Sequence, residues 1–196
     1  MGIWERVHHT LRTKVRQAYG RQPASTAAIL DSQTIKLGDQ GGVRGYDAGR
    51  KTAGRKRHFL VDVLGLLLGV YVRSSDELDR DGTKTLLGRC SHRYGRLAKI
   101  WADAGGAGTL VTWVKALRPR GRLHLDIVHR PGNEKGRQVL HRRRIVERTI
   151  GWFVMQRRLV RHCEARTERS EAMIYVTLIP LMLRRLARSN QKRLFI

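Results

Sequence analysis

The sequence predicts an α/β protein with a mixed sheet of five strands flanked by helices. Short apolar runs rich in β-branched residues alternate with longer segments whose apolar residues recur every three or four positions. Two of the apolar runs are separated by only two residues, which is typical of an antiparallel hairpin, whereas strands separated by helices are typical of parallel pairs. Because the chain has 196 residues, it is long enough to bury a core of its own.

The first predicted element is an amphipathic helix over residues 4–19. Its apolar residues recur at helical spacing, at Trp4, Val7, Leu11, Val15 and Tyr19. We therefore expect these side chains to pack against the core and the basic side chains of the helix to face solvent.

Three strands are predicted next. Residues 27–35 form the first, and residues 59–63 and 66–72 form a hairpin. The segment between the first strand and the hairpin, residues 37–57, is rich in Gly, Lys and Arg, which predicts a loop.

The second half of the chain alternates between helices and strands. The spacing predicts a helix at 79–88, a strand at 99–103, a helix at 110–117 and a strand at 123–129. Two helices follow, the first over residues 142–159. The second extends from an N-cap at Ser170 to about residue 186 and is apolar on nearly all sides.

The charge of the chain points to a polyanionic partner. There are 40 Lys and Arg residues against 16 Asp and Glu, which gives a formal net charge of +24. Such an excess favours nucleic acid as the partner, with an acidic membrane surface as the weaker alternative. The longest apolar run, residues 63–72, is too short to cross a bilayer, so we expect no membrane insertion.

The cysteines and the N-terminus indicate the compartment. Cys90 and Cys163 are far apart in the sequence, which excludes a disulfide framework and a zinc finger. The first residues contain no apolar signal-peptide core. The sequence therefore predicts a reduced, cytoplasmic protein.

Three of the few acidic residues stand on an apolar background. Asp31 and Asp103 fall on predicted strands, and Glu147 falls on a predicted helix. Each could simply pair with an arginine. Three carboxylates gathered at one place repel one another unless divalent cations bind between them. The spacing in the sequence is compatible with either interpretation.

Seven blocks of the sequence, in order, resemble the DDE transposases of the insertion-sequence-five type. The blocks are residues 27–34 (AAILDSQT), 41–51 (GGVRGYDAGRK), 54–58 (GRKRH), 79–82 (DRDG), 100–103 (IWAD), 146–149 (VERT) and 170–175 (SEAMIY). The resemblance implies an RNase H-like fold, with Asp31 on the first strand, Asp103 near the fourth and Glu147 on a following helix. It also implies that these three residues are the catalytic triad.

The resemblance implies three segments of chain. Residues 1–24 would be an N-terminal amphipathic helix and linker, residues 25–187 the catalytic domain, and residues 188–196 a basic tail. Family members carry a further helical DNA-binding region before the segment that begins at Trp4. We therefore expect a partial chain, either a second reading frame joined to an upstream polypeptide or a truncated copy.

The implied activity is metal-dependent DNA cleavage and strand transfer at insertion-sequence ends. Two Mg²⁺ ions, which Mn²⁺ can replace, suit such a reaction and prefer carboxylate oxygens. By analogy with the family, Asp31 would bridge both ions, Asp103 would bind one and Glu147 the other. The alternatives are a non-catalytic basic module that binds nucleic acid and an inactive transposase remnant.

The basic blocks are predicted to contact DNA phosphates, although ordinary solvated charge is the simpler interpretation of any one of them. The expected DNA-binding residues are Arg44, Arg50, Lys51, Arg55, Lys56, Arg57, Arg143, Arg144, Arg148, Arg157 and Arg158. The expected partners are double-stranded DNA at transposon ends and targets, and further copies of the chain on that DNA. We expect the protein to associate with the nucleoid.

Overall fold

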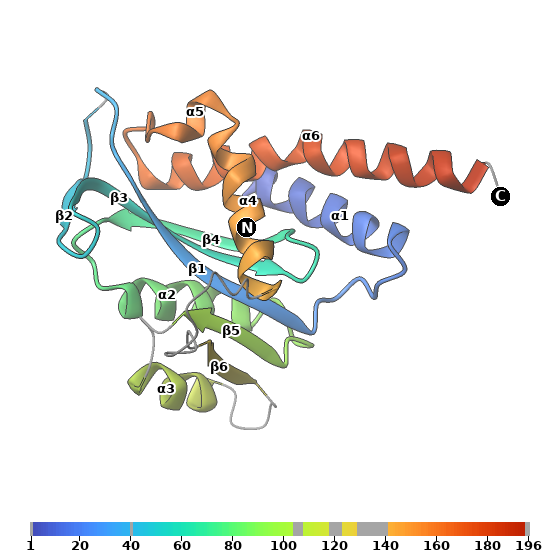
Figure 1. Cartoon of the computed structure of the whole chain (residues 1–196), viewed down its shortest axis with the longest axis horizontal. Helices are drawn as coiled ribbons and strands as arrows, with labels where there is room; N and C mark the ends of the chain where they lie inside the picture. Colours follow the sequence, from blue (N-terminus) through green and yellow to red (C-terminus); the bar gives the residue numbers. More distant parts are fainter. Residues whose placement is uncertain (1, 40, 104–107, 118–122, 129–140, 195–196) are drawn as a thin grey trace, which may run out of the picture.

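The computed structural model describes residues 2–39, 41–103, 108–117, 123–128 and 141–194. Helices and strands alternate along the chain (Figure 1). The elements of the first half are α1 (Ile3–Ala18), β1 (Ala27–Ile35), β2 (Gly45–Asp47), β3 (Thr52–Asp62), β4 (Leu67–Ser74) and α2 (Asp79–Ser91). Those of the second half are β5 (Lys99–Asp103), α3 (Thr109–Leu117), β6 (His124–Val128), α4 (His141–Val154), α5 (Arg157–Val160) and α6 (Thr167–Leu194).

The strands form one mixed sheet, which confirms the predicted fold class. The main path is β4-β3-β1-β5-β6, with antiparallel pairing from β4 to β1 and parallel pairing from β1 to β6. Short β2 is a sixth strand that the sequence did not predict, and it pairs with the start of β3. This order is consistent with an RNase H-like domain.

Helices cover both faces of the sheet, because side chains alternate between the faces along each strand. Leu30 of β1 belongs to an apolar cluster with residues of α2 and α3. Its neighbour Ile29 belongs to a second cluster on the opposite face, with residues of α4 and α6. The sheet is therefore the middle layer of three, as Figure 1 shows.

The predicted loop at residues 37–57 is wrong in its second half. β3 already begins at Thr52, and its basic residues Arg55, Lys56 and Arg57 are all buried. Each cation is matched by carbonyl or carboxylate oxygens in the interior, so a polar sequence can form a central strand. Sequence composition alone could not reveal these distant partners.

The predicted orientation of the first helix is only partly correct. Val15 is completely buried and Leu11 packs against the same apolar cluster, as expected. Trp4, Val7 and Tyr19, however, are 47%, 38% and 49% exposed, whereas Arg12 and Arg16 are buried. The reason is a buried carboxylate at the end of β3, because Asp62 is completely inaccessible and pairs with Arg16 at 2.5 Å. A buried charge without a partner is so costly that α1 turns its polar stripe inward.

The last two predicted helices differ from the structure in their bounds. α4 ends at Val154 and the short α5 follows, while α6 begins at Thr167 rather than at Ser170. The apolar segment of this last helix is largely enclosed, as expected. Its fully buried apolar residues form one stripe, Ile174, Tyr175, Leu178 and Met182, and most of its other residues between 172 and 186 are half-buried. α6 lies along α1 in Figure 1. No described helix is long and apolar enough to span a membrane.

Candidate functional site

The structure brings Asp31 and Asp103 together at neighbouring strands. β1 and β5 are parallel, and Ile29 pairs with Trp101 in their register. Asp31 and Asp103 each follow two residues later, so they project from the same face of the sheet as Ile29 and Trp101. Both of those residues pack in the cluster beneath α4 and α6. Strand pairing, rather than sequence separation, therefore places the two carboxylates side by side.

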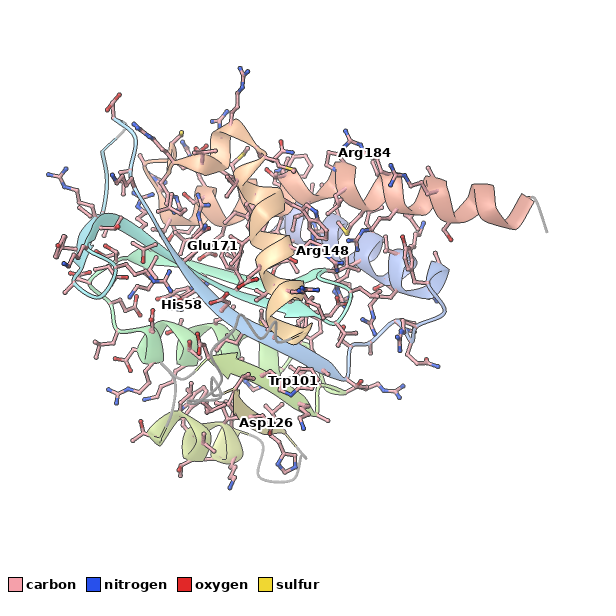
Figure 2. The ribbon with its side chains drawn as sticks, in the orientation of Figure 1. His58, Trp101, Asp126, Arg148, Glu171 and Arg184 are labelled. Atoms are coloured by element: carbon pink, nitrogen blue, oxygen red, sulfur yellow. The ribbon has the colours of Figure 1, made fainter. Side chains whose placement is uncertain are left out.

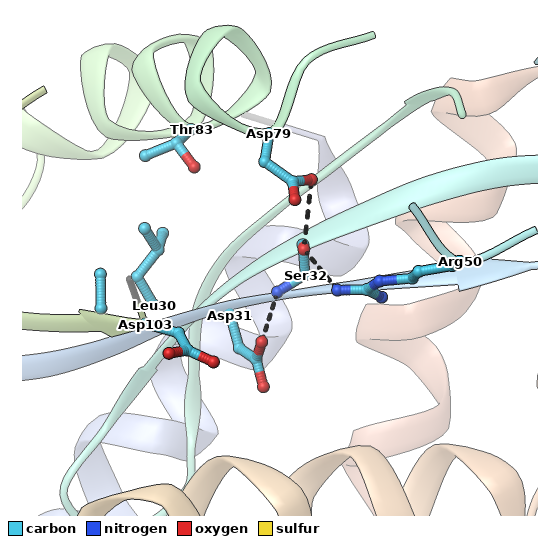
Figure 3. A pocket seen from close by; sticks show the side chains of 8 residues that line it. Leu30, Asp31, Ser32, Arg50, Asp79, Thr83 and Asp103 are labelled. Atoms are coloured by element: carbon cyan, nitrogen blue, oxygen red, sulfur yellow. Dashed lines mark hydrogen bonds between the residues drawn. The ribbon is translucent and has the colours of Figure 1, made fainter. Parts of the chain in front are cut away.

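The two carboxylates line one pocket of about 110 Å³. Its remaining lining residues are Leu30, Ser32, Arg50, Asp79, Thr83 and Ala102. Figure 3 shows the carboxylates of Asp31 and Asp103 on one side of the strands, and Asp79 and Thr83 from α2 on the other. Asp31 is half-buried and Asp103 is exposed, so the pocket is open to a ligand.

Hydrogen bonds fix the geometry of the pocket at Ser32. The backbone N–H of Ser32 donates to Oδ1 of Asp31 at 2.8 Å, and its hydroxyl donates to Oδ1 of Asp79 at 3.3 Å. The same hydroxyl accepts an N–H from Arg50 at 3.0 Å. Ser32 and Asp79 are functional candidates that the sequence analysis did not single out. The one available signal was that both fall within blocks that resemble the transposase family.

The third predicted carboxylate, Glu147, lies on α4. Its neighbour Val146 is buried in the same cluster as Ile29, and α4 packs against β1. Glu147 itself is exposed and is not among the residues that line the pocket. Within the described ranges, no three His, Cys, Asp or Glu side chains lie close enough together to hold a metal ion. The structure therefore joins two of the three carboxylates, and the role of Glu147 stays a prediction.

The chemistry of the pocket suits a hard divalent cation. Asp31 and Asp103 supply carboxylate oxygens, which are the ligands that Mg²⁺ and Mn²⁺ prefer. Among the described residues that line the pocket there is neither a histidine nor a cysteine, which softer metals would favour. The donor set of this pocket thus fits the predicted ion.

Three of the predicted DNA-binding residues have internal partners instead. Arg55 donates to the carbonyl oxygens of Glu164 and Ala165, and Arg57 donates to the carbonyl oxygen of Leu159. The ammonium group of Lys56 lies 3.0 Å from the carboxylate of Asp79 and 3.4 Å from that of Asp47. The side chains of Arg55, Lys56 and Arg57 are buried, so in this structure they stabilise the fold and do not face a phosphate.

Arg148 also has an internal partner. Arg148, which is labelled in Figure 2, donates to the carbonyl oxygen of Leu64 and lies over the ring of Trp152. The side chain of Arg143 lies outside the described residues. Arg148 is nevertheless exposed, as are the remaining predicted cations Arg44, Arg50, Lys51, Arg144, Arg157 and Arg158. Of these, Arg158 pairs with Glu164 at 2.9 Å.

Two buried histidines lie next to the structural cations. Burial lowers the pKa of His58 to about 4, and burial together with Arg57 lowers the pKa of His162 to about 2. His162 is hydrogen-bonded to Arg57 and to Ser170. Both the lowered pKa and the N–H that Arg57 donates to Nε2 favour a neutral imidazole, which links β3 to α6.

Comparison with known proteins adds one match. The family model described as "Transposase DDE domain" matches residues 22–183, which is 162 of the 196 residues. The matched segment contains Asp31, Asp103 and Glu147. No curated protein matches the chain.

Proposed function

Because the chain belongs to the family of transposase DDE domains, we propose that it is the catalytic part of an insertion-sequence transposase, of the insertion-sequence-five type. The proposed reaction is metal-dependent cleavage and strand transfer at the ends of the element. The observation that carries this proposal is the meeting of Asp31 and Asp103 in one pocket at adjacent parallel strands. If each aspartate only stabilised the fold, it would need no second carboxylate in the same pocket.

We propose that Asp31 and Asp103 hold the metal and that Glu147 completes the site from α4. Two bound Mg²⁺ ions would activate the attacking hydroxyl and stabilise the leaving oxygen. The protein's own contribution is to hold the carboxylates in place. Asp31 is fixed by the Ser32 N–H, and Asp103 is fixed by its place at the end of a paired strand.

Cleavage of DNA is the direct test of this function. Purified protein and supercoiled DNA that carries the element's ends should yield nicked product in Mg²⁺ or Mn²⁺ and none in EDTA. Substitution of Ca²⁺ serves as a control, since Ca²⁺ binds carboxylates but takes a looser, larger coordination shell. If nicking in EDTA equals nicking in Mg²⁺, or if neither metal supports nicking, the chain is not an active metal-dependent catalytic domain. Either result favours the non-catalytic binding module or the inactive remnant.

DNA binding should be dominated by phosphate contacts. If roughly six phosphates are contacted, raising salt from 50 to 200 mM should weaken binding by about a thousandfold. We expect replacement of Arg144, Arg157 and Arg158 by alanine to make the fall of log affinity with log salt concentration less steep. Fluorescence anisotropy measures this salt slope.

A matched control removes three exposed cations from other elements, Lys14, Arg96 and Lys115. The control variant should keep a steeper slope than the first variant. An affinity that does not change with salt would exclude DNA as the partner.

A further inference from the structure

Arg50 is the one positively charged side chain among the described residues that line the pocket, and contacts within the fold hold it there. Residues 48–51 connect β2 to β3 in a tight antiparallel turn and carry Arg50. Lys51, which follows, has a φ of 50°, in the left-handed region that residues other than glycine seldom adopt. Such strain persists only where surrounding contacts enforce it, and it often accompanies function.

Asp47 is the contact that enforces this turn. Its carboxylate accepts the hydroxyl of Thr34 at 2.6 Å and the backbone N–H of Arg50 at 3.1 Å. Lys56 lies 3.4 Å from the same carboxylate. Burial alone would raise the pKa of Asp47, but these hydrogen bonds and the charge of Lys56 outweigh it and lower the pKa. The carboxylate therefore stays ionised and ties the turn to β1 and β3.

Ser32 connects the guanidinium of Arg50 to the carboxylate of Asp31, and both side chains line the pocket. Arg50 donates one N–H to the Ser32 hydroxyl, and the N–H of Ser32 donates to Asp31. Figure 3 shows Arg50 reaching along β1 toward the two catalytic candidates. Of the described residues that line the pocket, Arg50 is the only one with a positive charge.

Among the residues that the structure describes, the positive charge of Arg50 has no ion-pair partner. Three carboxylates, those of Asp31, Asp79 and Asp103, line the same pocket, but none of them lies within ion-pair distance of Arg50. A guanidinium has five N–H donors, and the Ser32 hydroxyl takes one of them. Arg50 is exposed, so the other donors can meet an anion in the pocket.

We propose that Arg50 binds the scissile phosphate during DNA cleavage. This inference rests on the proposed function. In the hydrolytic step, a water oxygen forms a bond to phosphorus and releases its proton to solvent, and the bond from phosphorus to the 3′ oxygen breaks. The leaving oxygen takes up a proton and becomes a 3′-hydroxyl. Arg50 donates to a non-bridging oxygen, which gains charge in the transition state.

The experiment compares Arg50→Ala and Arg50→Lys with a control outside the pocket. Arg96→Ala is the matched control, since it also removes one exposed positive charge but does not line the pocket. Single-turnover cleavage is measured at saturating DNA, and the Kd for DNA is measured separately. Urea unfolding checks that each variant is folded.

We expect Arg50→Ala to lower the single-turnover rate by about 10²- to 10³-fold, the usual effect of losing one transition-state donor. Its Kd should change less than about threefold, and Arg50→Lys should recover part of the rate. Millimolar guanidinium ion should partly restore Arg50→Ala without accelerating wild type or Arg96→Ala. Arg96→Ala should cleave at nearly the wild-type rate.

Two results would overturn the inference while leaving the proposed function standing. One is wild-type cleavage by Arg50→Ala. The other is a weaker Kd with an unchanged rate at saturation, which would make Arg50 an ordinary backbone contact. Absence of cleavage by wild type in either metal is a different result, because it removes the proposed function and this inference together.

Discussion

Replacing Asp31 by asparagine is expected to reduce metal-dependent DNA cleavage to background while DNA binding is unchanged or tighter. Asparagine has nearly the same shape, and its carbonyl oxygen can still accept the Ser32 N–H at 2.8 Å. The fold should therefore persist. The variant loses the negative charge that the metal requires, and it also loses repulsion toward phosphate.

The control for Asp31→Asn is Asp126→Asn. Asp126 lies on the same sheet, opposite Trp101 in the register of β6 with β5, and pairs with Lys99 at 2.7 Å (Figure 2). It does not line the pocket. Cleavage by Asp126→Asn should stay close to wild type. Near-normal cleavage by Asp31→Asn would contradict the assignment of Asp31 as a metal ligand.

Replacing Asp62 by alanine should lower the free energy of unfolding by about 3–5 kcal/mol. Asp62 is completely buried and pairs with Arg16, whose side chain is 5% exposed. It also accepts the backbone N–H groups of Leu64 and Leu66, both at 2.9 Å. The variant leaves a buried guanidinium and two buried N–H groups without their acceptor, and each of these losses is costly.

Two further variants separate the charge from the hydrogen bonds. Asp62→Asn keeps an acceptor for the turn but leaves Arg16 unpaired, so it should still be clearly destabilised in urea unfolding. Adding Arg16→Met to Asp62→Asn removes the unpaired charge and should restore part of the loss. If the double variant is less stable than Asp62→Asn alone, the cost does not come from an unpaired buried cation.

The sequence correctly predicted the elements that depend on local pattern. The strand at 99–103 has the predicted bounds, and the hairpin around residues 64 and 65 is antiparallel as expected. Asp31 and Asp103 could also be recognised as unusual, because each is an acid on an apolar strand. Alternation along a strand and spacing along a helix are properties of neighbours in the chain, so they are visible without the fold.

Other features depend on partners far away in the sequence. Spacing showed that α1 has two faces, but only Asp62, 46 residues beyond Arg16, decided that the polar face turns inward. Arg55 is buried because carbonyl oxygens 109 and 110 residues later accept its N–H groups. The cost of an unpaired buried charge exceeds the gain from burying a few apolar side chains, so tertiary partners overrule the local pattern.

The candidate site also depends partly on local pattern and partly on tertiary contacts. The sequence by itself determined which carboxylates were available and placed two of them on strands. Only the tertiary structure brought Asp31 and Asp103 into one pocket, through the parallel pairing of β1 with β5. Only the turn held by Asp47 placed Arg50 in the same pocket. Strand register and turn anchoring are long-range contacts, and no spacing within a single segment encodes them.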